Sequence, residues 1–116
     1  MRDTVLTCIR GDDNFFDLDA DVDLDAGDQI WFKAAHREAD LNETDALIKK
    51  GRNVAGQSGI ADIDAPTGKF QLQLEPADLD DVLESALVYK IILRKVDSGM
   101  DTTLHKGPLV LTSRSG

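Results

Sequence analysis

The residues that most readily suggest chemistry are five aspartates spaced two apart. Asp17, Asp19, Asp21, Asp23 and Asp25 alternate with an apolar residue at every intervening position. Carboxylate oxygens are the usual ligands of Ca²⁺, so a calcium site is the first hypothesis that this row raises.

The spacing of the row fits a calcium site poorly. An EF-hand loop needs acids at positions 1, 3 and 5, Gly at position 6 and Glu at position 12. A loop that began at Asp21 would have Ala26 and Phe32 at the last two of these positions, and the frame two residues earlier fails in the same way. Side chains that alternate along a strand also spread over about 25 Å, too far to converge on one ion. We therefore interpret the row as a solvated sheet face and expect neither a metal nor a cofactor.

The other residues of catalytic type form no recognisable constellation. His36 and His105 lie in different segments, and neither has a cysteine at the spacing of a zinc ligand. Cys8 lies within a short apolar run, which favours a buried small hydrophobe over a nucleophile. The sequence has no phosphate-binding glycine loop and no Gly-x-Ser-x-Gly turn. We expect no catalytic residues and no enzymatic activity.

Two short motifs carry little weight. Residues 10–12 read Arg-Gly-Asp, the integrin-binding tripeptide, but they begin a dense turn cluster at 10–14. Residues 42–44 match a glycosylation sequon, yet they also suit the cap of a helix, which is the interpretation that we favour.

The charge balance restricts the partners. The chain has 13 basic and 22 acidic residues, a net charge of −9, and 18 of the acids are Asp. A field of this sign repels phosphate backbones and anionic membranes, so we expect no nucleic-acid or membrane partner. With one cysteine, no signal-peptide pattern and no apolar stretch of about 20 residues, we expect a cytoplasmic protein or a particle assembled there.

The elements that would position these residues are mostly strands. A chain of 116 residues indicates one domain, residues 1–116, ending in a polar tail at 113–116. The alternation at 16–25 predicts a strand that bends into a turn at 25–28. In the next strand Ile30, Phe32 and Ala34 should point inward, with Trp31 and Lys33 opposite. Trp31 would then either anchor a partner or pack under a helix.

A capping-box pattern at 40–43 followed by apolar residues and Lys-Lys-Gly predicts a short helix over 40–50. Residues 51–59 indicate a loop, and 60–64 with 69–74 a hairpin around a Pro-Thr-Gly turn. One helical turn is expected within 78–85, a central strand over 87–96, a hairpin loop at 97–99, and a last strand over 102–111 with a break at Gly107 and Pro108. Together these elements predict a mostly-β fold, a two-sheet antiparallel immunoglobulin-like sandwich of about seven strands with one short helix.

Taken in order, the segments resemble a family of tailed-phage virion proteins, the N-terminal domain of the baseplate upper protein. The resemblance covers nearly the whole chain and depends on the order of short pieces, which are Arg10-Gly11-Asp12, Phe15-Phe16, Asp23-Leu24, Phe32-Lys33, 46–50, 68–74, 77–78, Tyr89 and 107–111.

The resemblance implies an immunoglobulin-like domain that works as an assembly element of a tail or baseplate, without catalytic residues. Its expected partners are other virion or tail proteins, or further copies of itself in a symmetric assembly, and its expected location is the virion. Trp31 and the aspartates Asp17, Asp19 and Asp21 are the candidate partner contacts. The alternative is a stand-alone immunoglobulin-like module that binds calcium or a glycan through loops at one end of the sandwich.

Overall fold

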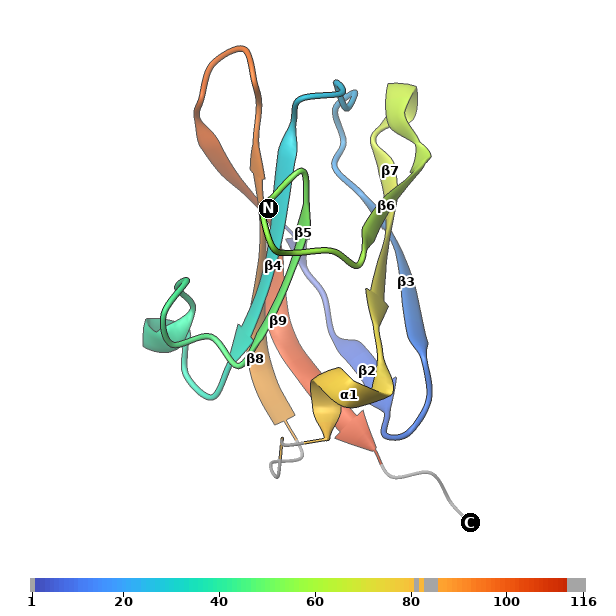
Figure 1. Ribbon diagram of the computed structural model, residues 1–116, viewed down its shortest axis with the longest axis vertical. Coiled ribbons are helices and arrows are strands. Elements are labelled where there is room, and N and C mark those ends of the chain that lie inside the picture. Colours follow the sequence, from blue (N-terminus) through green and yellow to red (C-terminus); the bar gives the residue numbers. More distant parts are fainter. Residues whose placement is uncertain (1, 81, 83–85, 113–116) are drawn as a thin grey trace.

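The protein consists of two β-sheets that face each other across a shared core (Figure 1). The computed structural model describes residues 2–80, 82 and 86–112. The strands are β1 (Arg2–Asp3), β2 (Leu6–Ile9), β3 (Asn14–Asp19), β4 (Gln29–Ala35), β5 (Ile48–Arg52), β6 (Ile60–Asp64), β7 (Lys69–Leu74), β8 (Ala86–Arg94) and β9 (Asp101–Thr112). The helical elements are the 3-10 turns η1 (Glu38–Asp40) and η2 (Ala65–Thr67) and the helix α1 (Pro76–Leu79).

The larger sheet, sheet A, is mixed, which corrects the expectation of two antiparallel sheets. Its strands follow the order β1-β9-β8-β4-β5, and β2 also pairs with β9. Both β1 and β2 run parallel to β9, whereas the β9–β8, β8–β4 and β4–β5 pairs are antiparallel. A parallel pair needs a long connection, and here almost the whole chain separates the partners. Sheet B is antiparallel, with the order β3-β7-β6. The described residues thus form nine strands, where the sequence predicts about seven.

The inward face of each sheet follows the predicted alternation. On β4, Ile30, Phe32 and Ala34 are fully buried, and Phe70, Leu72 and Leu74 are fully buried on β7. Across sheet A the rings of Phe32 and Tyr89 stack with centroids 5.8 Å apart. These side chains belong to one hydrophobic cluster, so the two sheets share a single core. The β6–β7 hairpin lies where the sequence predicts it, and β8 is a central strand as expected.

The strand predicted from the alternation at 16–25 ends early. Strand β3 stops at Asp19, and Asp21 has a left-handed backbone with φ 61°. Val22 is 45% exposed instead of facing the core, while Ala20 and Leu24 are buried. Aspartate disfavours extended strands and tolerates the left-handed region, so the bend falls within the acidic run. The turn at 25–28 is present, with the N–H of Asp28 donating to the carbonyl of Asp25.

The helix predicted over 40–50 is absent. The capping signal is local only: the side chain of Asn42 accepts hydrogen bonds from the N–H groups of Thr44 and Asp45, and a turn follows. From Ile48 the chain forms β5, which pairs with the edge of β4. The loop predicted over 51–59 therefore begins at Asn53, after the end of β5. Sheet pairing therefore outweighs the helical pattern, because it satisfies the exposed hydrogen-bonding groups of β4.

The last strand is continuous through Gly107 and Pro108, where the sequence predicts a break. Strand β9 runs unbroken, and the interruption lies in its N-terminal neighbour, between the end of β1 and the start of β2. A Cβ on Gly107 would lie 2.5 Å from the carbonyl oxygen of Thr4, so glycine permits this close crossing. The irregularity in register lies opposite Ile91 and Ile92 instead.

The helical turn expected within 78–85 is found earlier, as α1, and part of the predicted range lies outside the described residues. The polar tail at 113–116 also lies outside them. Among the described residues, no helix is long and apolar enough to cross a membrane.

Candidate functional site

The outer face of sheet A carries a row of lysines. Residues directly opposite each other on neighbouring strands share a face, and the register pairs Lys49 of β5 with Lys33 of β4, Lys33 with Lys90 of β8, and Lys90 with Lys106 of β9. The four lysines therefore lie on one line across four adjacent strands, whose backbones are about 4.8 Å apart. Like charges directly opposite each other on neighbouring strands destabilise a sheet, so the lysine row lowers the stability of the fold.

One half of the lysine row is neutralised by the connection between β4 and β5. Lys33 forms an ion pair with Glu43, with 3.1 Å between Nζ and Oε1, and Lys49 donates to the backbone carbonyl of Glu43 at 2.9 Å. Burial raises the pKa of the Glu43 carboxyl, but the hydrogen bond and charge of Lys33 outweigh it and lower the pKa below its usual value. Lys90 and Lys106 differ: among the described residues their side chains make no hydrogen bond or ion pair.

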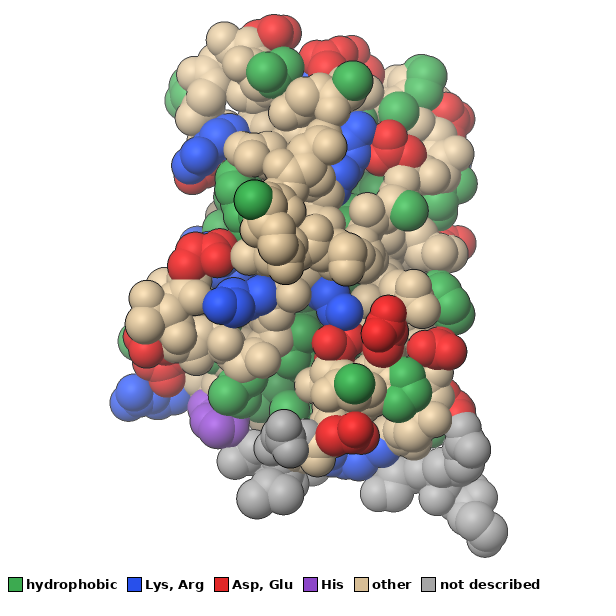
Figure 2. All heavy atoms as spheres, in the orientation of Figure 1, with side chains coloured by type: hydrophobic (Ala, Val, Ile, Leu, Met, Phe, Trp, Pro, Cys, Tyr) green, Lys and Arg blue, Asp and Glu red, His purple; other side chains and the backbone are tan. Residues whose placement is uncertain are grey.

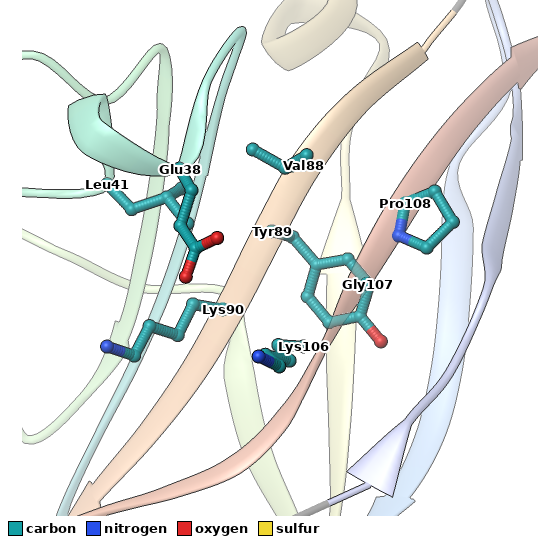
Figure 3. Close-up of a pocket in the computed structure, with 8 residues that line it drawn as sticks. All are labelled: Glu38, Leu41, Val88, Tyr89, Lys90, Lys106, Gly107 and Pro108. Carbon is teal, nitrogen blue, oxygen red and sulfur yellow. The ribbon is translucent and has the colours of Figure 1, made fainter.

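A pocket of about 280 Å³ adjoins these two lysines (Figure 3). Glu38 and Leu41 approach it from the β4–β5 connection, and the other lining residues come from β8 and β9 (Val88, Tyr89, Lys90, Lys106, Gly107 and Pro108). Tyr89 points into the core, where its hydroxyl donates to the carbonyl of Thr4 at 2.6 Å. The pocket therefore combines an apolar lining with two ammonium groups and one carboxylate at its rim.

Trp31 lies on the same outer face, one row from the lysines. It is half-buried, stands opposite Ile92 of β8, and the guanidinium of Arg94 lies 5.0 Å from its ring centroid. Arg94 is held there by a bidentate pair with Asp101, at 2.6 and 3.0 Å. The predicted helix is absent, so the interpretation in which Trp31 packs under it is wrong. Trp31 instead lines a shallow pocket of about 290 Å³ with Lys33, Glu43, Ile92, Arg94 and Asp101.

The candidate aspartates lie elsewhere. Asp17 and Asp19 belong to β3 in sheet B, where Asp17 accepts a hydrogen bond from Gln71 at 3.1 Å, and Asp21 lies beyond the end of the strand. They do not form one site with Trp31, which is on the outer face of the other sheet. Figure 2 shows the corresponding distribution, with mostly acidic side chains on the side of sheet B and both signs interspersed on the side of sheet A.

A buried carboxylate, which the sequence analysis did not single out, connects the loops at one end of the two sheets. Asp28 is fully buried and accepts hydrogen bonds from Lys95 Nζ at 2.6 Å and from the N–H groups of Val96 and Asp25 at 2.8 Å. Burial raises the pKa of Asp28, but these hydrogen bonds outweigh it and lower the pKa below its usual value. Arg52, itself mostly buried, donates to the carbonyl of Asp28 and pairs with Asp62. This cluster is saturated by its own partners, which indicates a structural role.

Two further residues of catalytic type, Cys8 and His105, are buried in the fold. Cys8 is fully buried, as expected, and burial raises the pKa of its thiol to about 11. His105 is buried, with Nε2 3.1 Å from the carbonyl oxygen of Asp19, and its Nδ1 has no hydrogen-bond partner among the residues that the structure describes. In the described part of the chain, no three His, Cys, Asp or Glu side chains gather in a way that could hold a metal ion.

Comparison with known proteins adds little to this geometry. No protein-family model matches the chain, and no curated protein does. Among solved structures, the chain is similar to the extracellular domain of the voltage-gated sodium channel beta4 subunit, whose parallel homodimers are described as explaining a role in cell–cell adhesion. The two are 15% identical, and the similarity covers 99% of this chain and 95% of that one with a TM-score of 0.46. At that score the likeness carries no argument about function.

Proposed function

We propose that this chain is an immunoglobulin-like sandwich that serves as a non-enzymatic structural protein of a phage or prophage tail or baseplate. It acts by protein–protein contact through the outer face of sheet A. The order of sequence segments that resembles the baseplate upper protein supports the phage assignment. The outer face of sheet A supports the mode of action.

The observation that carries this proposal is the arrangement around Trp31. Tryptophan and arginine are the side chains most enriched at the energetic centres of protein interfaces. Here Arg94 stacks on Trp31 and is fixed by Asp101, so both side chains are held in place before a partner arrives. Ile92 and the lysine row flank them on a broad sheet face. Side chains that are already ordered lose less entropy on binding, which favours affinity.

The test begins with the genes that flank the coding sequence. Products of neighbouring tail-tube, tape-measure or baseplate genes are co-expressed with the chain and separated by size-exclusion chromatography. We expect a stoichiometric complex that Trp31→Ala weakens by at least tenfold, since truncating a central interface tryptophan typically costs about 2 kcal/mol or more. Phe15→Ala, which removes an aromatic that is 55% exposed on sheet B, is the matched control and should leave the complex intact.

Trp31 is the only tryptophan in the sequence, so its fluorescence reports directly on this face. Binding of the partner should shift its emission to shorter wavelength as water is excluded. A complex that forms with unchanged Trp31 emission and full tolerance of Trp31→Ala would refute the surface. The absence of phage structural genes around the coding sequence, with no co-eluting product, would refute the tail assignment.

A further inference from the structure

One edge of sheet A is formed by an uncharged segment, residues 4–9. This segment includes β2 and pairs with β9 on one side only, so its other side is a sheet edge. It reads Thr-Val-Leu-Thr-Cys-Ile, without a charged residue or a proline. Val5 is 59% exposed and Ile9 is 41% exposed, with Thr7 exposed between them. We call residues 4–9 the neutral edge.

The other edge strands in the described part of the chain are protected. Strand β1 consists of two charged residues, β3 carries Asp17 and Asp19, and β6 carries Asp62 and Asp64 with a shift in register between them. The edge of β5 is covered by the loop that follows it, which bridges to Gly51. Charges, bulges and covering loops are the usual means by which proteins prevent pairing between sheet edges. The neutral edge has none of these features among its own residues.

The backbone hydrogen bonds determine which groups of the neutral edge point outward. The N–H of Thr4 donates to the carbonyl of Lys106 at 3.0 Å, and the N–H of Arg10 donates to the carbonyl of Thr112 at 2.9 Å. Successive residues of a strand direct their N–H and C=O groups to opposite sides, so the even-numbered residues of this segment face β9. The backbone groups of the odd-numbered residues therefore face the open side.

At Ile9 the open side is already occupied. The side-chain amide of Asn14 accepts a hydrogen bond from the N–H of Ile9 at 2.9 Å and donates one to its carbonyl at 3.0 Å, as a neighbouring strand would. The backbone groups of Val5 and Thr7 have no such partner among the residues that the structure describes. Two N–H and two C=O groups per copy are thus open to a further strand.

We propose that two copies of the chain pair through the neutral edge, antiparallel, with Val5 of each copy opposite Thr7 of the other. Residues in a hydrogen-bonded antiparallel pair exchange both of their bonds, so four N–H···O=C bonds use every open group of the two copies. The two-fold axis passes between the two Leu6 residues. A register with Thr7 opposite Thr7 would form only two of these bonds, because Val5 would then face Ile9, which Asn14 occupies.

A second copy fits this edge because the edge is complementary to itself. A two-fold contact needs a patch whose donors meet acceptors of the same patch, and Val5 and Thr7 satisfy this requirement. The pairing also places Val5 opposite Thr7 and diagonal to Ile9 of the other copy, so two exposed apolar side chains lose contact with water. Each copy has a net charge of −9, but at 0.15 M salt the Debye length is about 8 Å and long-range repulsion is screened.

The pairing makes sheet A continuous across both copies. The two-fold axis between antiparallel edge strands is perpendicular to the sheet, so the outer faces of the two copies lie on the same side. The two Trp31 surfaces then face one way, and a partner with two matching sites can bind both at once. The dimer does not depend on the proposed function, and it adds bivalent binding to it.

Two pairs of charge substitutions test the contact and its register. In Val5→Lys with Thr7→Lys, each lysine lies opposite a lysine of the other copy, and we expect about tenfold more protein to be needed for association. In Val5→Lys with Thr7→Glu, each lysine lies opposite a glutamate, so this matched variant should associate about as well as the wild type. Sedimentation velocity over a wide range of concentration in 0.15 M salt measures the association. Thermal melting verifies that each variant is folded.

A backbone substitution tests the hydrogen bonds themselves. Thr7→Pro removes an N–H that faces the open side, a position where edge strands tolerate proline, and it leaves the bonds to β9 intact. Because it removes two of the four bonds of the dimer, we expect association to weaken by at least about tenfold. Thr7→Val keeps the N–H and is the control, which should associate like the wild type.

Hydrogen exchange locates the contact. The amides of Val5 and Thr7 should exchange more slowly as the concentration of the wild-type chain rises, whereas the amide of Ile9, which is bonded to Asn14, should be protected at every concentration.

Three results would overturn the inference: a wild-type chain that stays monomeric, a Thr7→Pro variant that associates like the wild type, or equal association of the two charge variants. A monomeric chain in which an added tail protein protects the amides of Val5 and Thr7 would assign the edge to that protein instead. A monomeric chain that binds a tail protein through Trp31 would remove the dimer and leave the proposed function standing.

Discussion

Among single aspartate substitutions, those of Asp28 should destabilise the fold most, because its carboxylate is fully buried. Asp28→Asn keeps the shape of the side chain but removes its charge and turns one acceptor oxygen into a donor. That NH₂ group would face either Lys95 Nζ and the N–H of Asp25, which both donate to Oδ2, or the N–H of Val96, which donates to Oδ1.

The magnitude follows from these contacts. Hydrogen bonds to a charged group each contribute about 1.5–3 kcal/mol, and breaking a buried ion pair costs about 3–5 kcal/mol. The side chain of Lys95 is 26% exposed, so its charge regains some hydration when the pair is lost. We therefore expect Asp28→Asn to lower the free energy of unfolding by about 2–3 kcal/mol at pH 7, and Asp28→Ala by about 3–5 kcal/mol. Asp23→Asn, an exposed aspartate in the same connection, should stay within about 0.5 kcal/mol.

The pH dependence gives an independent check. The pKa of Asp28 is lower in the folded protein than the value of about 3.9 in an unfolded chain. As the pH falls, the unfolded state binds the proton first, so the contribution of Asp28 is complete above pH 5 and is lost as the pH falls through the folded pKa. The difference in stability between the wild type and Asp28→Asn should therefore shrink from pH 7 to pH 3.

Urea unfolding followed by circular dichroism at pH 7, 5 and 3 measures both quantities. A loss below 1 kcal/mol for Asp28→Asn at pH 7 would contradict the role assigned to the buried carboxylate. So would a difference from the wild type that stays constant down to pH 3, because the acid sensitivity would then arise elsewhere.

The remaining predictions concern the core and the aspartate row. Leu72→Ala should cost about 2–5 kcal/mol because Leu72 is fully buried between the sheets, whereas Gln73→Ala on the outer face of β7 should cost about 0.5 kcal/mol or less, and equal losses in urea unfolding would contradict the register. Millimolar calcium should raise the melting temperature no more than magnesium at equal ionic strength, because Asp17 and Asp19 form a solvated face where cations act by screening. A calcium-specific rise that Asp19→Asn abolishes would instead favour the alternative binding module.

Strands with one buried face were predictable from sequence. On β7, and on β4 as far as Ala34, the positions expected to face inward are the buried ones, because a strand that borders a core buries every second side chain. The hairpin turn was equally predictable, since Pro66 and the positive φ of Gly68 encode it locally. The acidic run was only half predictable, because aspartate is compatible with both a solvated strand and a left-handed bend.

What depended on long-range pairing was not predictable. Residues 48–52 carry a helix-like ending, yet they became a strand because the edge of β4 offered hydrogen bonds that an isolated segment lacks. The parallel pairing of β1 and β2 with β9 brings together the N-terminal and C-terminal segments of the chain, and no local sequence pattern predicts it.

The candidate site, like the strand pairing, depends on long-range structure and was only partly predictable from the sequence. Sequence singled out Trp31 and the aspartates by residue type, and it indicated the outward face of β4. It left Lys33, Lys49, Lys90 and Lys106 as four unrelated lysines on separate segments. Only the register of four paired strands brings them into one row, and only the approach of the β4–β5 connection to β8 and β9 forms a hollow beside two of them. Side-chain alternation is a property of each strand alone, whereas neighbours across a sheet are set by how strands pair, which is a property of the whole chain.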